Sequence, residues 1–278
     1  SLTMLPSALA LVGDEAEGLS RPAFEHDIVI FADPVFSLSA LAQLDAAPDP
    51  AGRTLRGDWA DGLARLPWSR FEAQSVAERF DEGRVLTFLD RDATKANLLS
   101  PAARRARILH VASHAFFDPR APDLVGLAAT PSASGDPASG FVTIQELLAG
   151  NFASEMVVIS GCETGRGANL RGEGLMSLAR GFMARGVDSV LATHWPVADR
   201  PSAMFMGAFY EALADGASPP AALQQAQISL RDQFGNVPFF WGAYVLESAT
   251  VASSAAGGDG TARSGLADDH QGQGSVVD

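Results

Sequence analysis

Residues 155–160 read EMVVIS, a short apolar run with β-branched side chains, and the glycine-rich stretch GCETGRG follows at residues 161–167. A run of this length and composition is typical of a buried strand. Residues 172–185 then carry apolar side chains at helical spacing, so the segment predicts a strand, a tight turn and a helix. This order is the repeating unit of an α/β fold with a mostly parallel sheet.

The same alternation extends in both directions from this segment. Further strands are predicted at residues 27–31, 84–89, 107–113, 188–193 and 239–247, and helices at residues 70–80, 92–99, 201–214 and 219–233. The first strand should end at Asp33-Pro34, because proline has no backbone N–H to pair with a neighbouring strand. We therefore expect an α/β fold in which helices cover a mostly parallel sheet.

Length and composition favour one main domain. The chain has 278 residues, of which 47% are hydrophobic, and this is enough for one large core. We expect that domain at residues 24–247, after an N-terminal lead-in at residues 1–23. Residues 248–278 are rich in Ser, Gly, Ala and Asp, so a disordered tail is predicted there. Residues 45–52 and 131–140 have the composition of loops.

Charge and apolar patterning argue against several kinds of partner. The net charge of -13 provides no basic surface for a phosphate backbone, so no direct nucleic-acid partner is expected. No apolar run reaches the roughly 18 to 20 residues of a membrane span. A single cysteine cannot form an internal disulfide, which favours a cytoplasmic location. The chain opens on Ser1 without a basic leader, so we expect no signal peptide and an excised fragment of a longer protein.

One cysteine and one histidine directly follow predicted strands. Cys162 comes two residues after the strand at residues 155–160, and His114 comes immediately after the strand at residues 107–113. Ligands of open parallel sheets bind outside the carboxyl ends of the strands, so both side chains are expected at one cleft. An imidazole there can remove the proton of a thiol and later protonate a leaving amine. The arrangement predicts a Cys–His dyad.

Each of these residues also has a purely structural interpretation. A lone cysteine is commonly a buried thiol, and a histidine at a strand end can satisfy polar groups of the core. His110 shares the strand face of His114 but lies about 13 Å further back along the strand, so we expect it to be a core histidine.

Other site chemistries fit the sequence poorly. Residues 165–170 lack the third glycine of a dinucleotide-binding turn, and the chain has no Gly-Lys-Ser/Thr phosphate loop. One cysteine and five scattered histidines offer neither C-x-x-C nor H-E-x-x-H spacing for a metal. We therefore expect no cofactor and no metal.

Four segments together resemble the CHAT domain, a relative of caspases and separases. They are LHVASHAFFDP, VVISGCETGRG, GEGLMSLARGFMARGVDSVLATHWPVAD and PFFWGAYVLE, in the family's order within residues 24–247. The resemblance implies a caspase-hemoglobinase-like three-layer sandwich with helices on both faces of the sheet, and with the histidine strand before the cysteine strand. It also implies an N-terminal TPR sensor region outside this sequence. His114 and Cys162 lie 48 residues apart, close to the spacing of about 50 in caspases.

The resemblance also implies substrate-binding residues. Asp199 matches the floor of the pocket for the side chain before the scissile bond, where a carboxylate favours Arg or Lys. The resemblance also implies that the Ala115 amide contributes to the oxyanion site. Apart from the resemblance, Gly161 would let backbone amides approach the site closely, and Glu163 is a candidate to line the cleft. An N-terminal helix cap would explain Asp199 equally well, because Arg200-Pro201 follows it.

One departure from the family pattern concerns the residue after the histidine. Such peptidases usually carry His-Gly, whereas this chain has His114-Ala115, and glycine adopts positive φ at lower cost than alanine. The predicted function is a cysteine endopeptidase that cleaves protein or peptide substrates after a basic residue. The alternative is a catalytically weak or inactive caspase-like module for interaction or regulation.

Overall fold

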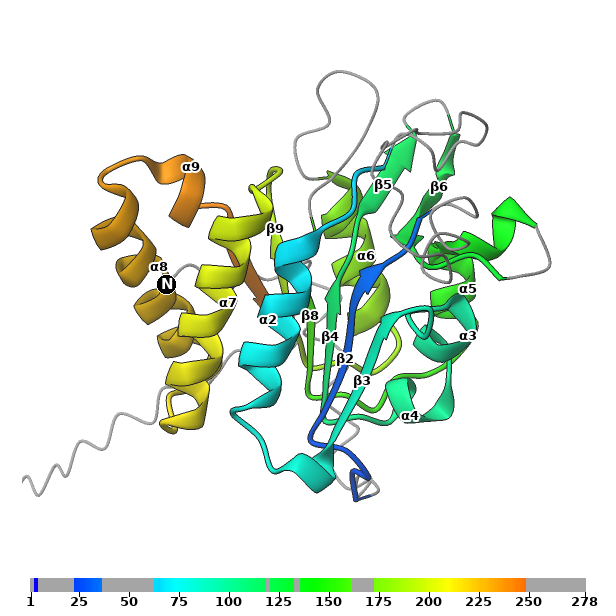
Figure 1. The fold of residues 1–278 in the computed structure, drawn as a ribbon, viewed down its shortest axis with the longest axis horizontal. Coiled ribbons are helices and arrows are strands. Elements are labelled where there is room, and N and C mark those ends of the chain that lie inside the picture. The colour runs from blue at the N-terminus through cyan, green and yellow to red at the C-terminus, as the bar shows by residue number, and fades with distance from the viewer. Residues whose placement is uncertain are drawn as a thin grey trace, which may run out of the picture.

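A computed structural model describes residues 3–4, 23–36, 63–118, 121–132, 136–161 and 173–248. Within this part, seven strands form one sheet in the order β1-β10-β9-β8-β4-β2-β3 (Figure 1). The strands from β9 to β3 run parallel, whereas β10 is antiparallel to β9. These strands are β1 (Thr3–Met4), β2 (Ile28–Pro34), β3 (Val85–Asp90), β4 (Ile108–Ala112), β8 (Met156–Ile159), β9 (Ser189–Thr193) and β10 (Tyr244–Ser248).

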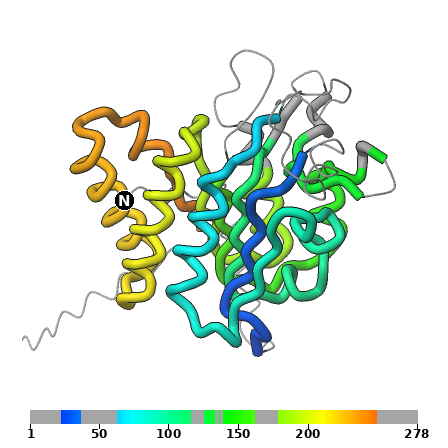
Figure 2. Tube along the Cα trace, in the orientation of Figure 1, coloured from blue at the N-terminus to red at the C-terminus, as the bar shows by residue number. Residues whose placement is uncertain are grey.

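Helices cover both faces of this sheet. Helices α2, α7 and α8 lie side by side on one face, and α3, α4, α5 and α6 cover the other (Figure 1 and Figure 2). The helices are α2 (Pro67–Ala77), α3 (Lys95–Leu98), α4 (Pro101–Arg104), α5 (Ile144–Leu148), α6 (Glu173–Met183), α7 (Asp199–Ala214), α8 (Pro219–Phe234) and α9 (Pro238–Trp241), with 3-10 turns η3 (Glu82–Arg84) and η4 (Pro137–Gly140).

Alternate side chains of the central strands point to the two helical layers. In β2, Ile28 and Ile30 belong to the same buried cluster as Phe205 of α7. Val29 and Phe31 belong to the cluster on the opposite face. Side chains alternate across a strand, and a strand buried on both faces has a continuous apolar sequence. This is why the short apolar runs of the sequence form the central strands.

A second sheet extends from the carboxyl edge of the main one (Figure 1). It is antiparallel, in the order β5 (Ala115–Asp118), β6 (Ala121–Ala128) and β7 (Phe141–Thr143). β5 begins directly after His114, so the small sheet starts at the predicted dyad histidine. Helix α5 follows β7 at once, because Thr143 and Glu146 form a capping box at its first turn.

The three-layer α/β fold with a mostly parallel sheet confirms the prediction. The five parallel strands lie within one to three residues of the predicted bounds. The helix expected at residues 92–99 is shorter, since only Lys95–Leu98 are helical. The strand expected at residues 239–247 is wrong in its first part, because Pro238–Trp241 form α9 and β10 starts only at Tyr244. Pro238 has the φ of a first helical residue, and a short apolar run does not distinguish helix from strand.

Two of the three predicted loops lie outside the described residues, at residues 45–52 and 249–278. In the third loop, at residues 131–140, the last four residues form η4.

None of the helices in the described part is long and apolar enough to cross a membrane.

Candidate active site

The site is at the carboxyl edge of β4 and β8, which are neighbours in the sheet. Their residues pair in parallel from Ile108↔Met156 to Val111↔Ile159, a constant offset of 48 positions. His114 lies two residues beyond the end of β4, and Gly161 lies two residues beyond the end of β8. Cys162 and Glu163 lie outside the described residues. The structure therefore shows the histidine side of the expected dyad and the chain position that precedes the cysteine.

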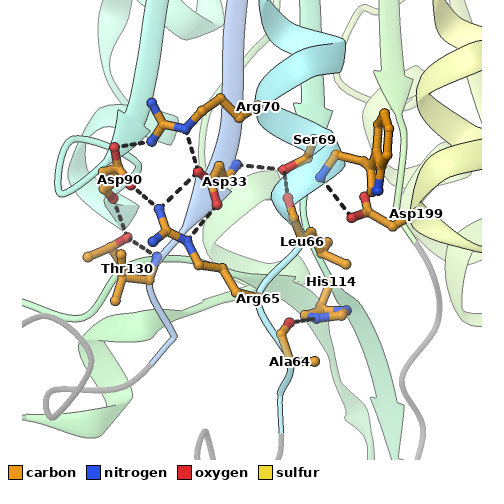
Figure 3. Close-up of polar contacts among 12 residues, drawn as sticks. Asp33, Ala64, Arg65, Leu66, Ser69, Arg70, Asp90, His114, Thr130 and Asp199 are labelled. Carbon is orange, nitrogen blue, oxygen red and sulfur yellow. Dashed lines mark hydrogen bonds and ion pairs between the residues drawn. The ribbon is translucent and has the colours of Figure 1, made fainter. Parts of the chain in front are cut away.

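The His114 ring is buried and oriented by a backbone carbonyl. Its Nε2 atom lies 2.7 Å from the Ala64 carbonyl oxygen, and its side chain is 3% exposed (Figure 3). A carbonyl only accepts hydrogen bonds, so Nε2 carries a proton, and in the neutral ring Nδ1 is then the basic nitrogen. The Phe36 ring packs against the imidazole with centroids 4.8 Å apart. These contacts fix both the ring plane and the tautomer.

Gly161 packs directly against the chain that leads into His114. A Cβ built on Gly161 would lie 2.1 Å from the Ser113 carbonyl oxygen and 3.7 Å from the Ala115 amide nitrogen. The Thr193 hydroxyl donates to the Gly161 carbonyl at 3.3 Å, so β9 also holds this turn. Only glycine allows the two backbones to approach this closely. The strand ends that precede the two predicted catalytic residues are therefore in contact.

Ala115 has a backbone conformation that alanine adopts without strain. Among the described residues, positive φ outside glycine occurs at Asp33 and Asp90, and Ala115 is not among them. Ala128 N donates to His114 O at 2.8 Å, which makes His114 and Ala128 a hydrogen-bonded pair. Pairs alternate in an antiparallel ladder, so the next pair, Ala115↔Leu127, has an Ala115 N–H that points away from β6. Alanine in place of the family's usual glycine therefore still leaves the Ala115 N–H pointing away from β6.

Asp199 caps a neighbouring helix rather than its own. Helix α7 begins at Asp199, and its N-cap residue, Ala198, makes no side-chain cap. Instead, Asp199 Oδ2 accepts from the Trp68 backbone N–H at 2.9 Å, at the first turn of α2 (Figure 3). The simple N-cap interpretation of Asp199 is therefore wrong, because the amides that the carboxylate meets belong to another segment.

The electrostatic surroundings of Asp199 favour its protonated form relative to an ordinary aspartate. Burial raises the pKa of Asp199, the Trp68 amide opposes this, and the negative charges of Glu72 and Asp33 raise the pKa further. The side chain is partly accessible, and the Arg200 guanidinium lies 5.3 Å from the centre of the Trp68 ring beside it. The carboxylate therefore lies next to a residue, Trp68, whose ring contacts a guanidinium group.

His110 is a core residue, as expected from its place in the strand. Its Nδ1 lies 3.1 Å from the Tyr210 hydroxyl, and its Nε2 lies 2.9 Å from Glu72 Oε1. All three side chains are almost completely buried between β4, α2 and α7. Burial and the nearby Glu72 carboxylate raise the pKa of Tyr210, so its hydroxyl stays protonated. This network joins the sheet to two helices and does not reach the site.

Sequence reasoning missed an ionic cluster beside His114. Asp33, at the end of β2, binds Arg65 through Oδ1 and Oδ2 at 2.7 and 2.9 Å, and Arg70 Nε through Oδ2 at 2.8 Å. Both guanidinium groups also bind Asp90, at the end of β3 (Figure 3). The sequence signal for this cluster is a charged residue at the carboxyl end of a predicted strand, but the Asp33-Pro34 step predicts only the end of that strand.

Comparisons with known proteins identify the family. Residues 1–248 match the CHAT domain. This chain belongs to the CHAT domain family. The CHAT chain is 26% identical over 195 residues to mouse Tetratricopeptide repeat protein 28, covering 57% of this chain and 8% of the relative. The human protein of the same name is 26% identical over 194 residues, with the same coverage. The chain therefore matches only a small part of these relatives.

Two solved structures are similar in fold to this chain at low sequence identity. The Arg-specific cysteine proteinase gingipain R is 10% identical, with a TM-score of 0.46, covering 81% of this chain and 46% of the proteinase chain. A complex of Porphyromonas gingivalis RgpB pro- and mature domains is 9% identical with the same TM-score, covering 81% of this chain and 47% of that chain. Among the described residues of the CHAT chain, no cluster of His, Asp and Glu could hold a metal ion.

Proposed function

We propose that this CHAT domain is a cysteine endopeptidase in which Cys162 is the nucleophile and His114 transfers protons. The observation that carries the proposal is the pairing of β4 with β8. Each β8 residue lies 48 positions after its β4 partner, and Cys162 lies 48 positions after His114. The contact between Gly161 and Ser113 continues this register beyond the strands. If the register extends by one more residue, the two side chains belong to one cleft.

The orientation of His114 supports its role as the proton-transfer group. With Nε2 donating to Ala64, Nδ1 takes the thiol proton while Sγ attacks the carbonyl carbon of the scissile bond. The Ala115 N–H then donates to the oxygen that becomes negative. When the C–N bond breaks, Nδ1 returns the proton to the leaving amine. Water hydrolyses the thioester and restores the thiol.

Asp199 is proposed to bind the basic side chain that precedes the scissile bond. Its carboxylate is partly buried, and the exposed Trp68 ring lies alongside an arginine of the chain itself. A guanidinium of the substrate would find the same two chemistries there, a carboxylate and an aromatic face. Glu163 would add negative charge to the cleft. The substrates would therefore be proteins or peptides with exposed Arg or Lys.

Peptide cleavage tests this function. A peptide library varied at the residue before the scissile bond is incubated with wild type and with Cys162→Ala, His114→Ala and Asp199→Ala. We expect wild type to cleave after Arg or Lys, Cys162→Ala to show no cleavage, and His114→Ala to lose most of its cleavage activity. Asp199→Ala should reduce the rate of cleavage after Arg by about one to several powers of ten, because the buried guanidinium of the substrate loses its carboxylate partner. Wild type without activity would favour an interaction module instead.

The names of the relatives support one further part of the proposal. Both are tetratricopeptide repeat proteins. We infer that the natural protein also carries TPR repeats, which would act as the sensor that controls the domain. The sequence of the whole gene product tests this, because TPR units recur every 34 residues or so.

A further inference from the structure

We propose that Arg65 is a positioning residue for His114, and this inference rests on the proposed function. Arg65 follows Ala64, whose carbonyl oxygen accepts the hydrogen bond from His114 Nε2 at 2.7 Å. The segment at residues 63–66 is neither helix nor strand. No ladder of backbone hydrogen bonds therefore fixes the direction of the Ala64 carbonyl, and its neighbours must do so.

The Arg65 side chain is held by two carboxylates at strand ends. Asp33 is 3% exposed and binds Arg65 in a bidentate manner, from Nε to Oδ1 and from the terminal nitrogen to Oδ2. The same terminal nitrogen binds Asp90 (Figure 3). A bidentate guanidinium–carboxylate pair fixes orientation as well as distance. The chain next to Ala64 is thereby attached to the carboxyl ends of β2 and β3.

The backbone after Arg65 is attached to the same aspartate. The Ser69 hydroxyl donates to the Leu66 carbonyl at 2.6 Å and accepts from the Asp33 backbone N–H at 3.0 Å. Asp33 therefore holds the segment through both its side chain and its amide. Asp33 and Asp90 each have a φ of 49°, a left-handed conformation that is uncommon outside glycine. Strained positions of this kind cluster where a structure must orient a functional group.

A matched control is available within the cluster. Arg70 binds the same two carboxylates as Arg65, through Asp33 Oδ2 and Asp90. It reaches them from α2, whereas Arg65 is the residue directly bonded to the Ala64 carbonyl group. An ionic network can stabilise a fold without serving catalysis. If this cluster were only structural, Arg65→Met and Arg70→Met should behave alike.

The experiment compares wild type, Arg65→Met, Arg65→Lys and Arg70→Met by two readouts. The first is the 15N spectrum of the imidazole groups, with His114→Ala identifying the His114 signals among those of the five histidines. Wild type and Arg70→Met should show the Nε2-protonated tautomer, whereas Arg65→Met should show a mixture of tautomers. The second readout is peptide cleavage. Arg65→Met should lower kcat by about 10- to 100-fold with little change in KM, as expected for a misplaced catalytic group.

Arg65→Lys keeps the charge but loses the bidentate geometry, so it should give an intermediate spectrum and partial activity. It also keeps the inference testable if Arg65→Met does not fold. Equal spectra for all variants, or equal losses of kcat in Arg65→Met and Arg70→Met, would overturn the positioning role. If wild type cleaves no peptide, the proposed function fails, and the spectrum still decides whether Arg65 orients His114.

Discussion

Gly161 and Ser113 are in backbone contact, so close that a Cβ on Gly161 would lie 2.1 Å from the Ser113 carbonyl oxygen. Gly161→Ala must therefore push apart the ends of β8 and β4, which costs about 1 to 3 kcal/mol for an overpacked site. We expect lower stability in urea unfolding and a loss of cleavage. Gly207→Ala is the control, because its Cβ would meet only the Ser75 hydroxyl, at 3.7 Å. That helical substitution should not destabilise the fold, and equal destabilisation by both would contradict the contact.

Ala115→Gly restores the residue that the family usually has after the histidine. Ala115 has no positive φ, so glycine is not needed there, and its outward amide is present with either residue. We expect unchanged kcat and a loss of stability of about 0.5 to 1 kcal/mol from the added backbone freedom. A large gain in kcat would show that the alanine impairs the oxyanion site.

Tyr210→Phe tests whether the buried network of His110, Tyr210 and Glu72 affects the reaction. The change removes the hydroxyl that lies 3.1 Å from His110 Nδ1 and leaves a buried nitrogen without this partner. The expected cost is about 1 to 3 kcal/mol in urea unfolding. Cleavage by the folded protein should stay at the wild-type level, because the network lies in the core. Loss of kcat in a fully folded Tyr210→Phe protein would show that His110 takes part in the reaction.

Asp199→Asn tests the charge state of the proposed pocket. The folded pKa of Asp199 is raised above 3.8 by burial, so the folded state binds this proton more tightly than the unfolded state. That contribution to stability is present below pH 3.8 and is lost as pH rises through the folded pKa. Asparagine does not titrate, so the stability of the variant has no such dependence on pH. The variant should therefore gain stability relative to wild type as pH rises from 4 to 7, measured by urea unfolding.

The same ionisation sets a pH dependence of substrate preference. Binding of a basic side chain needs the carboxylate, so the KM for Arg peptides should rise as pH falls through the raised pKa of Asp199. Peptides with an uncharged residue at that position should not follow this trend. An identical pH profile of KM for both peptides would contradict the pocket assignment.

The central strands could be predicted from sequence because both faces of each are buried. Val157 and Val158 pack into opposite layers, so residues 155–160 form a continuous apolar run. The small sheet was not predicted, since β5 has four residues and β7 three, and strands this short carry little pattern. The eight residues of β6 include Pro122 and Gly126, which are uncommon inside strands. Residues 239–241 belong to α9 rather than to the predicted strand, because a short apolar run does not distinguish helix from strand.

The parts of the site that depend on tertiary contacts could not be predicted. The Ala64 carbonyl has no signature in the sequence, because every residue has one, and it meets a histidine 50 positions away. Asp199 lies at a helix start as expected, but the amide that it accepts from is 131 positions earlier in the chain. Only the fold shows which of several charged residues at strand ends face one another.

The most direct test of the Cys162–His114 assignment is covalent labelling followed by intact-mass measurement. A peptidyl acyloxymethyl ketone ending in Arg is incubated with wild type, Cys162→Ala and His114→Ala at neutral pH. We expect a single mass shift on wild type, none on Cys162→Ala, and a much slower shift on His114→Ala, since a thiol of pKa about 8.5 is mostly protonated without its partner. Equal labelling rates for wild type and His114→Ala, or a wild type that is not labelled, would contradict it.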